Sequence, residues 1–268
     1  MRPERRERLS PVVLVLAGLG LALLAVPPIA LVLRAPWPEM PALLTSSAVL
    51  EALALSVVTA IIATVLCLVL GVPLAVLLTR AVSWSAWARR PLRVAVTVPL
   101  VLPPVIGGIA LLSLLGRGGL LGSMLADLGV TVPYTTGAVV IAQTFVSLPF
   151  LVFAVEGALR SSARRAELAA QTLGASRGQV FRYVTVPVIA PGLAAGAVLC
   201  FTRALGEFGA TITFAGSLPG VTRTLPIASY LALQSDPSEA IALAVILLAV
   251  SIVVLLALRD RWMPGVAR

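Results

Sequence analysis

The sequence predicts an all-α, polytopic membrane protein with about six spanning helices. Hydrophobic residues make up 59% of the 268 residues and charged residues only 12%, and the mean hydropathy is +1.06. A typical soluble domain has about twice this charged fraction. The apolar residues also form uncharged runs near the length of about 20 residues that a helix needs to cross a bilayer. These observations exclude a water-soluble enzyme.

The apolar runs define the expected helices in order along the chain. The first is longer than the apolar core of most secretory signals, so we expect it to remain as an uncleaved helix. The second exceeds one bilayer thickness, which indicates tilt or an extension beyond the membrane. We expect residues 1–268 to form one transmembrane domain. Its helices are predicted at about 12–33, 52–79, 94–116, 134–158, 188–214 and 240–258.

The positions of the arginines predict the orientation of the chain. All 20 basic residues are arginines. Sixteen of them lie in the two tails, in the loop after the second helix and in the loop after the fourth, whereas the opposite loops hold only Arg34, Arg117 and Arg223. The positive-inside rule therefore places both termini in the cytoplasm. Topology thus accounts for the net charge of +9, and we expect no nucleic-acid partner.

Missing residue types exclude most catalytic sites. The chain has no lysine and no histidine, so it cannot form a phosphate-binding loop of the G-x-x-x-x-G-K-[ST] type, a Ser–His–Asp triad or an H-E-x-x-H zinc site. Cys67 and Cys200 lie in separate apolar runs and are interpreted as small buried hydrophobic residues. We therefore expect no catalytic residue, metal or cofactor in this chain.

The loop 160–187 is the most informative stretch. Ser161 or Ser162 can begin a short helix that Gly174 ends, and Ser176 can begin a second helix that stops at Pro187. Ala166, Ala169 and Ala170 give the first helix a face of small residues. From the residues alone, a surface for another protein and a hairpin that only connects two spans are equally consistent.

This loop resembles the EAA motif of binding-protein-dependent ABC importer permeases, which is E-A-A-x-x-x-G followed after nine residues by I-x-L-P. Ala169, Ala170 and Gly174 match, nine residues separate Gly174 from Val184, and Pro187 closes the pattern. Glu167 is displaced by one position, which leaves its role open. The resemblance implies a coupling helix that docks on a cytoplasmic ATPase subunit. The implied coupling residues are Glu167, Leu168, Ala169, Ala170, Leu173, Gly174, Val184 and Pro187.

Two spans carry residues that are unusual inside a membrane. The third contains three prolines and a glycine pair between positions 99 and 108, which permit a kink at a cavity or a kink used only for packing. In the fifth, Arg203 and Glu207 are spaced i, i+4 and can pair, either as a gate or anion contact or as a structural salt bridge. The candidate path or gate residues are Pro103, Pro104, Gly107, Arg203, Glu207 and Thr211.

Further stretches make the chain similar to the molybdate permeases of this family. These are L-P-P at 102–104, G-R-G-G-L-L-G at 116–122, G-E-F-G-A-T at 206–211 and F-A-G-S-L-P-G at 214–220. The resemblance implies the type I ABC importer permease fold and a role as the translocation subunit for molybdate. Sulfate or tungstate is the alternative substrate. A secondary transporter driven by ions is the alternative class, but it is expected to show inverted repeats, and none is visible.

The resemblance also implies the partners and the location. They are two copies of a cytoplasmic ABC ATPase that binds ATP and Mg²⁺, an extracytoplasmic molybdate-binding protein, a second copy of the permease and the lipid of a bacterial cell membrane. Because ATP hydrolysis belongs to the ATPase subunit, this chain is not expected to be an enzyme by itself.

Overall fold

The structure is a computed structural model that describes residues 10–160 and 164–257, and in those residues it contains helices and no strand. Five helices are long and apolar enough to cross a membrane, and a bent pair of helices brings the number to six if the pair is counted as one span. The all-helical prediction is therefore confirmed. In chain order the α-helices are α1 (Pro11–Leu33), α2 (Met40–Thr45), α3 (Ser47–Arg80), α4 (Ala86–Val101), α5 (Pro104–Leu115), α6 (Gly122–Asp127), α7 (Thr136–Ala158), α8 (Arg164–Thr172), α9 (Arg177–Val180), α10 (Val186–Leu205), α11 (Gly209–Ala215), α12 (Leu225–Ser235) and α13 (Pro237–Ala257).

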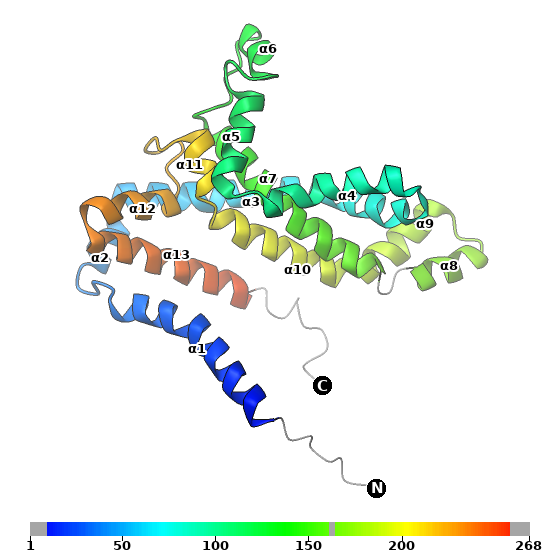
Figure 1. Ribbon diagram of the computed structural model, residues 1–268, viewed down its shortest axis with the longest axis horizontal. Helices are drawn as coiled ribbons and strands as arrows, with labels where there is room; N and C mark the ends of the chain where they lie inside the picture. The colour runs from blue at the N-terminus through cyan, green and yellow to red at the C-terminus, as the bar shows by residue number, and fades with distance from the viewer. Residues whose placement is uncertain (1–9, 161–163, 258–268) are drawn as a thin grey trace.

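The core of the fold is a bundle in which α3 and α10 pack along α7 (Figure 1). Glycines allow these helices to approach closely: a Cβ at Gly192 of α10 would lie 2.5 Å from the Cβ of Ala158 on α7, and one at Gly196 would lie 3.0 Å from the Cβ of Ala154. Gly192 and Gly196, four residues apart on α10, thus form a close packing face against α7. Cys67 and Cys200 are fully buried free thiols in this core, as expected.

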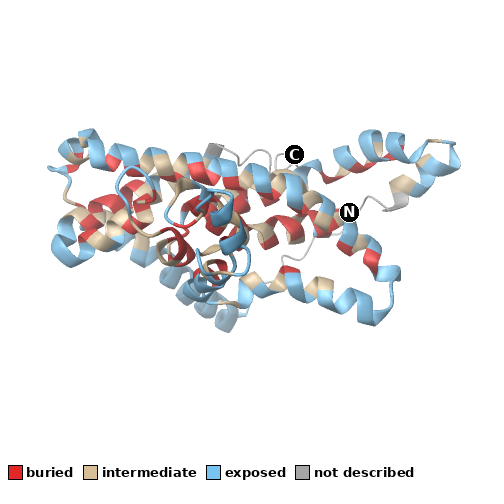
Figure 2. Ribbon diagram, turned by 90° about the horizontal axis from the view of Figure 1, so that it is seen from above, coloured by how far each residue is buried: buried red, intermediate tan, exposed pale blue. Residues whose placement is uncertain are grey.

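Burial divides the molecule into a packed centre and exposed margins. Figure 2 shows buried residues gathered along the central helices, whereas the segments at the end that carries α8 are mainly exposed. None of the residues of α1 is buried, although α1 contacts α13. In Figure 1, α1 and α13 run in opposite directions beside the bundle. Their apolar outer surfaces are those expected of helices that face lipid.

The third predicted span, 94–116, is wrong as a single helix. The chain instead forms α4 and α5, and its direction changes by 119° between them. The two helices run in clearly different directions in Figure 1. The break falls at Leu102 and Pro103, whose ψ angles of 130° and 135° are extended. Each of these residues precedes a proline, which disfavours the helical conformation. The sequence therefore predicted the kink correctly but not the size of the turn.

The fifth predicted span, 188–214, is also corrected. Helix α10 ends at Leu205, and a short break at 206–208 separates it from α11. Gly206 has φ −87° and ψ 7°, and Phe208 has φ −126° and ψ −55°. The carboxylate of Glu207 accepts a hydrogen bond of 2.8 Å from the backbone N–H of Ala210. This bond satisfies a donor at the start of α11 and so stabilises the new helix beginning there.

The other predicted spans agree more closely with the observed helices, except at the starts of the second and the sixth. Helix α3 begins five residues before the predicted start at 52. The predicted span began after Glu51 because that residue is charged, whereas the helix includes Glu51. Helix α13 begins at Pro237, and the predicted end at 258 lies outside the described residues. Helix α12 was not expected, because its 11 residues are too few for a span.

Candidate functional site

The coupling segment, residues 164–187, forms a compact helical hairpin at one end of the molecule. Gly174 ends the first arm with φ 85°, and Ser176 caps the second through a capping box with Gln179, both as predicted. The predicted start at Ser161 or Ser162 lies outside the described residues. The predicted stop at Pro187 is wrong, because helix continues from Arg177 to Leu205.

Two local features explain how the helix passes Pro187. The proline lies in the first turn of α10, directly after a turn whose hydrogen-bond spacing is not that of an α-helix. The preceding Phe181–Thr185 form a π-helical turn, in which the wider hydrogen-bond spacing relieves the clash between a proline ring and the carbonyl four residues earlier. The coupling segment is therefore continuous with the central bundle through α10.

Glu167 holds the two arms of the coupling segment together. Its carboxylate accepts a hydrogen bond of 2.5 Å from the hydroxyl of Thr185, which is 3% exposed. The glutamate that the sequence left without a clear role therefore makes a bond within the chain, between α8 and the residue before α10. This bond ties α8 to the residue that precedes α10.

Apolar side chains are exposed in α8 and at the residue that follows it. Leu168 is 56% exposed and Leu173 is 88% exposed, while Ala169 lies exposed beside them. An open hollow of about 380 Å³ lies next to Leu173, between the turn of the hairpin and its second arm. It is lined by Leu173, Gly174, Ala175, Gln179, Tyr183 and Val184. Exposed apolar side chains beside a hollow on a charged hairpin are typical of a protein-binding surface.

The second candidate group lies where the two broken spans meet, and we call it the helix-break centre: residues 103–108 with residues 203–213. A Cβ at Gly209 would lie 2.8 Å from the Cβ of Pro104. A Cβ at Gly108 would lie 2.7 Å from the Cβ of Thr213 and 2.8 Å from the carbonyl oxygen of Ala210. The start of α5 is thus in direct contact with α11 through two glycines, which permit a close backbone approach.

Arg203 and Glu207 pair across the break between α10 and α11. Their side chains form an ion pair of 2.6 Å, with side-chain exposures of 27% and 1%. The predicted i, i+4 pair is therefore present. The other oxygen of Glu207 accepts from the N–H of Ala210, so one buried carboxylate both neutralises the arginine and fixes the position of α11.

The other predicted path residues fall around this centre. Pro104 contacts Gly209, as described above, and a Cβ at Gly107 would lie 3.1 Å from the ring of Phe145 on α7. Pro103 is exposed at the bend. Thr211 is fully buried, and its hydroxyl has no hydrogen-bond partner among the described residues.

Sequence reasoning missed a set of buried polar side chains on α7. Gln143 is fully buried, and neither its amide oxygen nor its amide nitrogen has a partner in the described chain. The hydroxyls of Thr144 and Ser147 also lack partners there. Glutamine is uncommon at buried positions, so a single Gln in an apolar run was the signal that could have identified this stretch.

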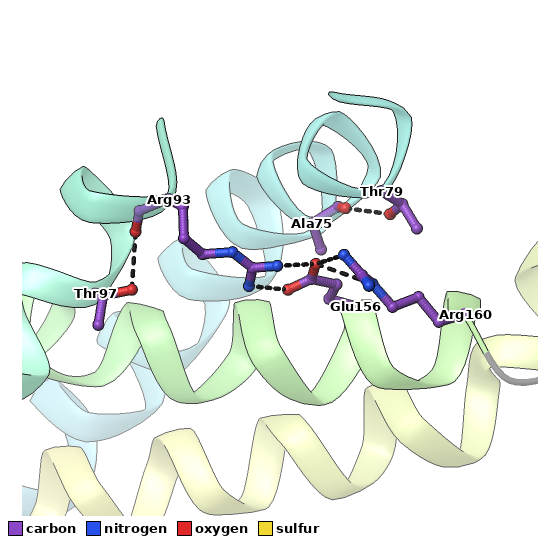
Figure 3. Close-up of polar contacts among 6 residues, drawn as sticks. All are labelled: Ala75, Thr79, Arg93, Thr97, Glu156 and Arg160. Carbon is purple, nitrogen blue, oxygen red and sulfur yellow. Dashed lines mark hydrogen bonds and ion pairs between the residues drawn. The ribbon is translucent and has the colours of Figure 1, made fainter. Parts of the chain in front are cut away.

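Sequence reasoning also missed a charge cluster at the end of α7, shown in Figure 3. Glu156 accepts two hydrogen bonds from Arg93 of α4, of 2.7 and 2.8 Å. It accepts two more, of 3.1 and 2.8 Å, from Arg160. The Glu156 side chain is only 5% exposed, whereas the two arginines are 41% and 49% exposed. Arg160 at i+4 was a readable signal, but Arg93 lies 63 residues away in sequence.

The loop after α11 is a compact turn of its own. Gly216 and Gly220 have φ 71° and 68°, values that favour glycine. The hydroxyl of Thr222 accepts from the N–H of Leu218 at 2.8 Å, and Arg223 donates to the hydroxyl of Ser217 at 3.1 Å.

Among the described residues, no three His, Cys, Asp or Glu side chains gather as metal ligands would.

Known proteins resemble this chain over most of its length. A family model described as "binding-protein-dependent transport system inner membrane component" matches residues 68–267. A molybdenum transport system permease protein of Mycobacterium tuberculosis is 49% identical over 242 residues, covering 90% of each chain. A sulfate transport system permease protein of Salmonella typhimurium is 36% identical over 220 residues, covering 82% of this chain and 78% of that protein.

A solved structure supports the fold. The crystal structure of a bacterial ABC transporter involved in the import of the acidic polysaccharide alginate contains a chain with a TM-score of 0.69 to this one. The match covers 96% of this chain and 95% of that chain, at 18% sequence identity. At this identity the likeness concerns the arrangement of helices alone.

Proposed function

Because this chain belongs to the family of binding-protein-dependent transport system inner membrane components, we propose that it is the membrane-spanning subunit of an ATP-driven importer for molybdate. The observation that carries the substrate is the 49% identity to a molybdenum permease over 90% of both chains. The sulfate permease relative is less similar, at 36% identity. Tungstate and sulfate remain the alternatives to be tested beside molybdate.

The exposed apolar side chains in and just after α8 form the proposed docking site for the ATPase subunit. Leu168 and Leu173 lie on the outside of a segment that Glu167 and Thr185 fix to α10. Burying such side chains against a partner gives a hydrophobic driving force. Through the bond between Glu167 and Thr185, a movement of the partner is transferred to α10 and from there to the break at residues 206–208.

The helix-break centre is the proposed gate. Both broken spans are irregular there, and irregular backbone inside a membrane is tolerated where protein or water satisfies its polar groups. The ion pair of Arg203 and Glu207 lies at this point. In alternating access, two copies of the bundle rock between inward-facing and outward-facing states. During this change we expect α5 and α11 either to move apart or to slide past each other.

The assembly and its orientation complete the proposal. One chain contains one coupling segment, so an importer with two ATPase subunits requires two permease copies, and we propose a homodimer in the bacterial cell membrane with the coupling segment and both termini in the cytoplasm. A binding protein on the outer side delivers molybdate. ATP and Mg²⁺ bind to the partner, and this chain itself is proposed to be a translocation subunit without catalytic residues.

Reconstituted ATPase activity tests this proposal. The chain, its ATPase subunit and the binding protein are placed in liposomes, and the binding protein is loaded with molybdate, tungstate or sulfate in turn. We expect hydrolysis to rise with molybdate or tungstate and not with sulfate. Stimulation by sulfate alone would overturn the substrate, and no stimulation by any loaded binding protein would overturn the importer role with these partners.

A further inference from the structure

Arg93, Glu156 and Arg160 form a charge cluster that is connected along the chain to both candidate sites. Glu156 is in the last turn of α7, four residues before Arg160, after which the chain leads to α8. Arg93 lies in α4, which leads through the bend at Leu102 and Pro103 into α5. The carboxylate of Glu156 therefore connects the end of α7, which leads to the coupling segment, with α4, which leads to the helix-break centre.

The geometry of the cluster is that of a specific joint between two helices. Arg93 binds both carboxylate oxygens of Glu156 in a bidentate pair, the strongest and most directional form of ion pair. The guanidinium carbon of Arg93 also lies 5.7 Å from the centre of the Phe153 ring on α7. Figure 3 shows the guanidinium groups of Arg93 and Arg160 reaching the carboxylate from opposite sides.

Few other contacts attach α4 to the bundle. Val96 is the single buried residue of α4, and α4 packs mainly on α7. Residues 82–91, which are the corner before α4 and the first residues of α4, are exposed throughout. The position of α4 relative to α7 therefore depends strongly on Arg93 and Glu156, and α4 in turn sets where α5 begins and meets α11.

We propose that Glu156 is a positioning residue that transmits movement between the coupling segment and the helix-break centre by moving α4 together with α7. Arg93 connects Glu156 to α4, and Arg160 orients the last turn of α7 before the coupling segment. The inference rests on the proposed function, because it assigns how ATPase movement reaches the gate of that same importer.

The alternative role is a static anchor that only stabilises the fold. A static anchor predicts a lower melting temperature with an unchanged amount of molybdate transported per ATP hydrolysed. A transmitting joint predicts that this ratio falls, because hydrolysis continues while α4 no longer follows α7. The transport ratio therefore separates the two roles, whereas expression or thermal stability alone does not.

The first variant is Arg93→Gln, which leaves Glu156 paired with Arg160 and so keeps the buried carboxylate satisfied. The matched control is Arg90→Gln in the same helix. Arg90 is exposed and has no ion pair within the described chain. We expect Arg93→Gln to lower the transport ratio at least about fivefold, the lower end of typical couplings between sites, and Arg90→Gln to leave it unchanged.

A second variant guards against misfolding. Arg93→Lys keeps the charge but cannot form the bidentate pair, so we expect a ratio between those of the unmodified chain and Arg93→Gln. A normal ratio in both Arg93 variants, beside an unmodified complex that transports molybdate, would overturn the inference alone. If the unmodified complex shows no stimulation by any oxyanion, the proposed function fails and the inference fails with it.

Discussion

The coupling segment and the helix-break centre contrast in how much of their chemistry the chain itself completes. In the helix-break centre, Gly108 and Gly209 bring α5 and α11 into backbone contact, and Glu207 is bonded at both oxygens within the chain. In the coupling segment, Leu168 and Leu173 have no cover. One region is thus closed by contacts within the chain, as we propose for a gate, whereas the other leaves apolar side chains uncovered, as we propose for a docking surface.

The largest effect is expected from removing the cation at the helix-break centre. Arg203→Ala leaves the buried carboxylate of Glu207 without its charge partner, which costs about 3 kcal/mol or more when a buried pair is broken. We expect molybdate uptake per assembled complex to fall more than the amount of assembled complex. Uptake into liposomes, normalised to assembled permease, measures this.

The matched control is Arg117→Ala, which removes an exposed arginine that has no ion pair in the described chain. If Arg203→Ala lowers only the amount of assembled complex and leaves uptake per complex unchanged, the ion pair is a structural salt bridge. The helix-break centre would then lose its assignment as a gate.

The next effect tests the backbone contact between α5 and α11. A Cβ in Gly108→Ala would lie 2.8 Å from the carbonyl oxygen of Ala210, so the two helices must move apart, at a cost of about 1–3 kcal/mol. We expect a lower melting temperature in detergent and slower transport. Gly118→Ala is the control, since a Cβ there meets nothing within 4 Å. Equal stability of the two variants would show that the close approach is not required.

The break positions show how far sequence reasoning reached. Hydropathy located the spans because insertion depends on the length of apolar runs, and the prolines at 103 and 104 located the first break. The 119° turn could not be predicted, because it depends on α5 packing against α11, about 100 residues later in the chain. The break after Leu205 was missed, because the capping bond from Glu207 to Ala210 looks like any helical i, i+3 spacing.

The coupling segment was the better predicted of the two regions. Its hairpin is local, and its signals, Gly174 and the capping box at Ser176, act over three or four residues. The bond of Glu167 to Thr185 spans 18 residues, and the pair of Arg93 and Glu156 spans 63. Local turn chemistry can be read from a sequence, whereas partners that meet only after the bundle has packed cannot.

A more local effect on the structure is expected from straining the hairpin of the coupling segment. Gly174→Val places a β-branched residue at φ 85°, which costs about 1–3 kcal/mol of local strain and reorients α8. We expect normal insertion but loss of ATPase stimulation by the loaded binding protein. Gly178→Val is the control: no heavy atom lies within 4 Å of its Cβ position, and its φ is not positive. Normal coupled transport in Gly174→Val would refute the coupling assignment.

The smallest effect on stability, and the sharpest test of the contrast, comes from Gln143. Its buried amide has no partner in the described chain, and such a group costs about 1–3 kcal/mol of unfolding free energy. Gln143→Met, which is similar in shape, is therefore expected to change the melting temperature little or to raise it.

If transport is also unchanged, Gln143 is a residue of the packed core, and the polar atoms on α7 have no part in the gate. If transport falls while stability is kept, the Gln143 amide takes part in transport and is not only a residue of the packed core. That result would extend the helix-break centre to the buried polar side chains of α7. Uptake and melting temperature, measured on the same preparation, decide between the two.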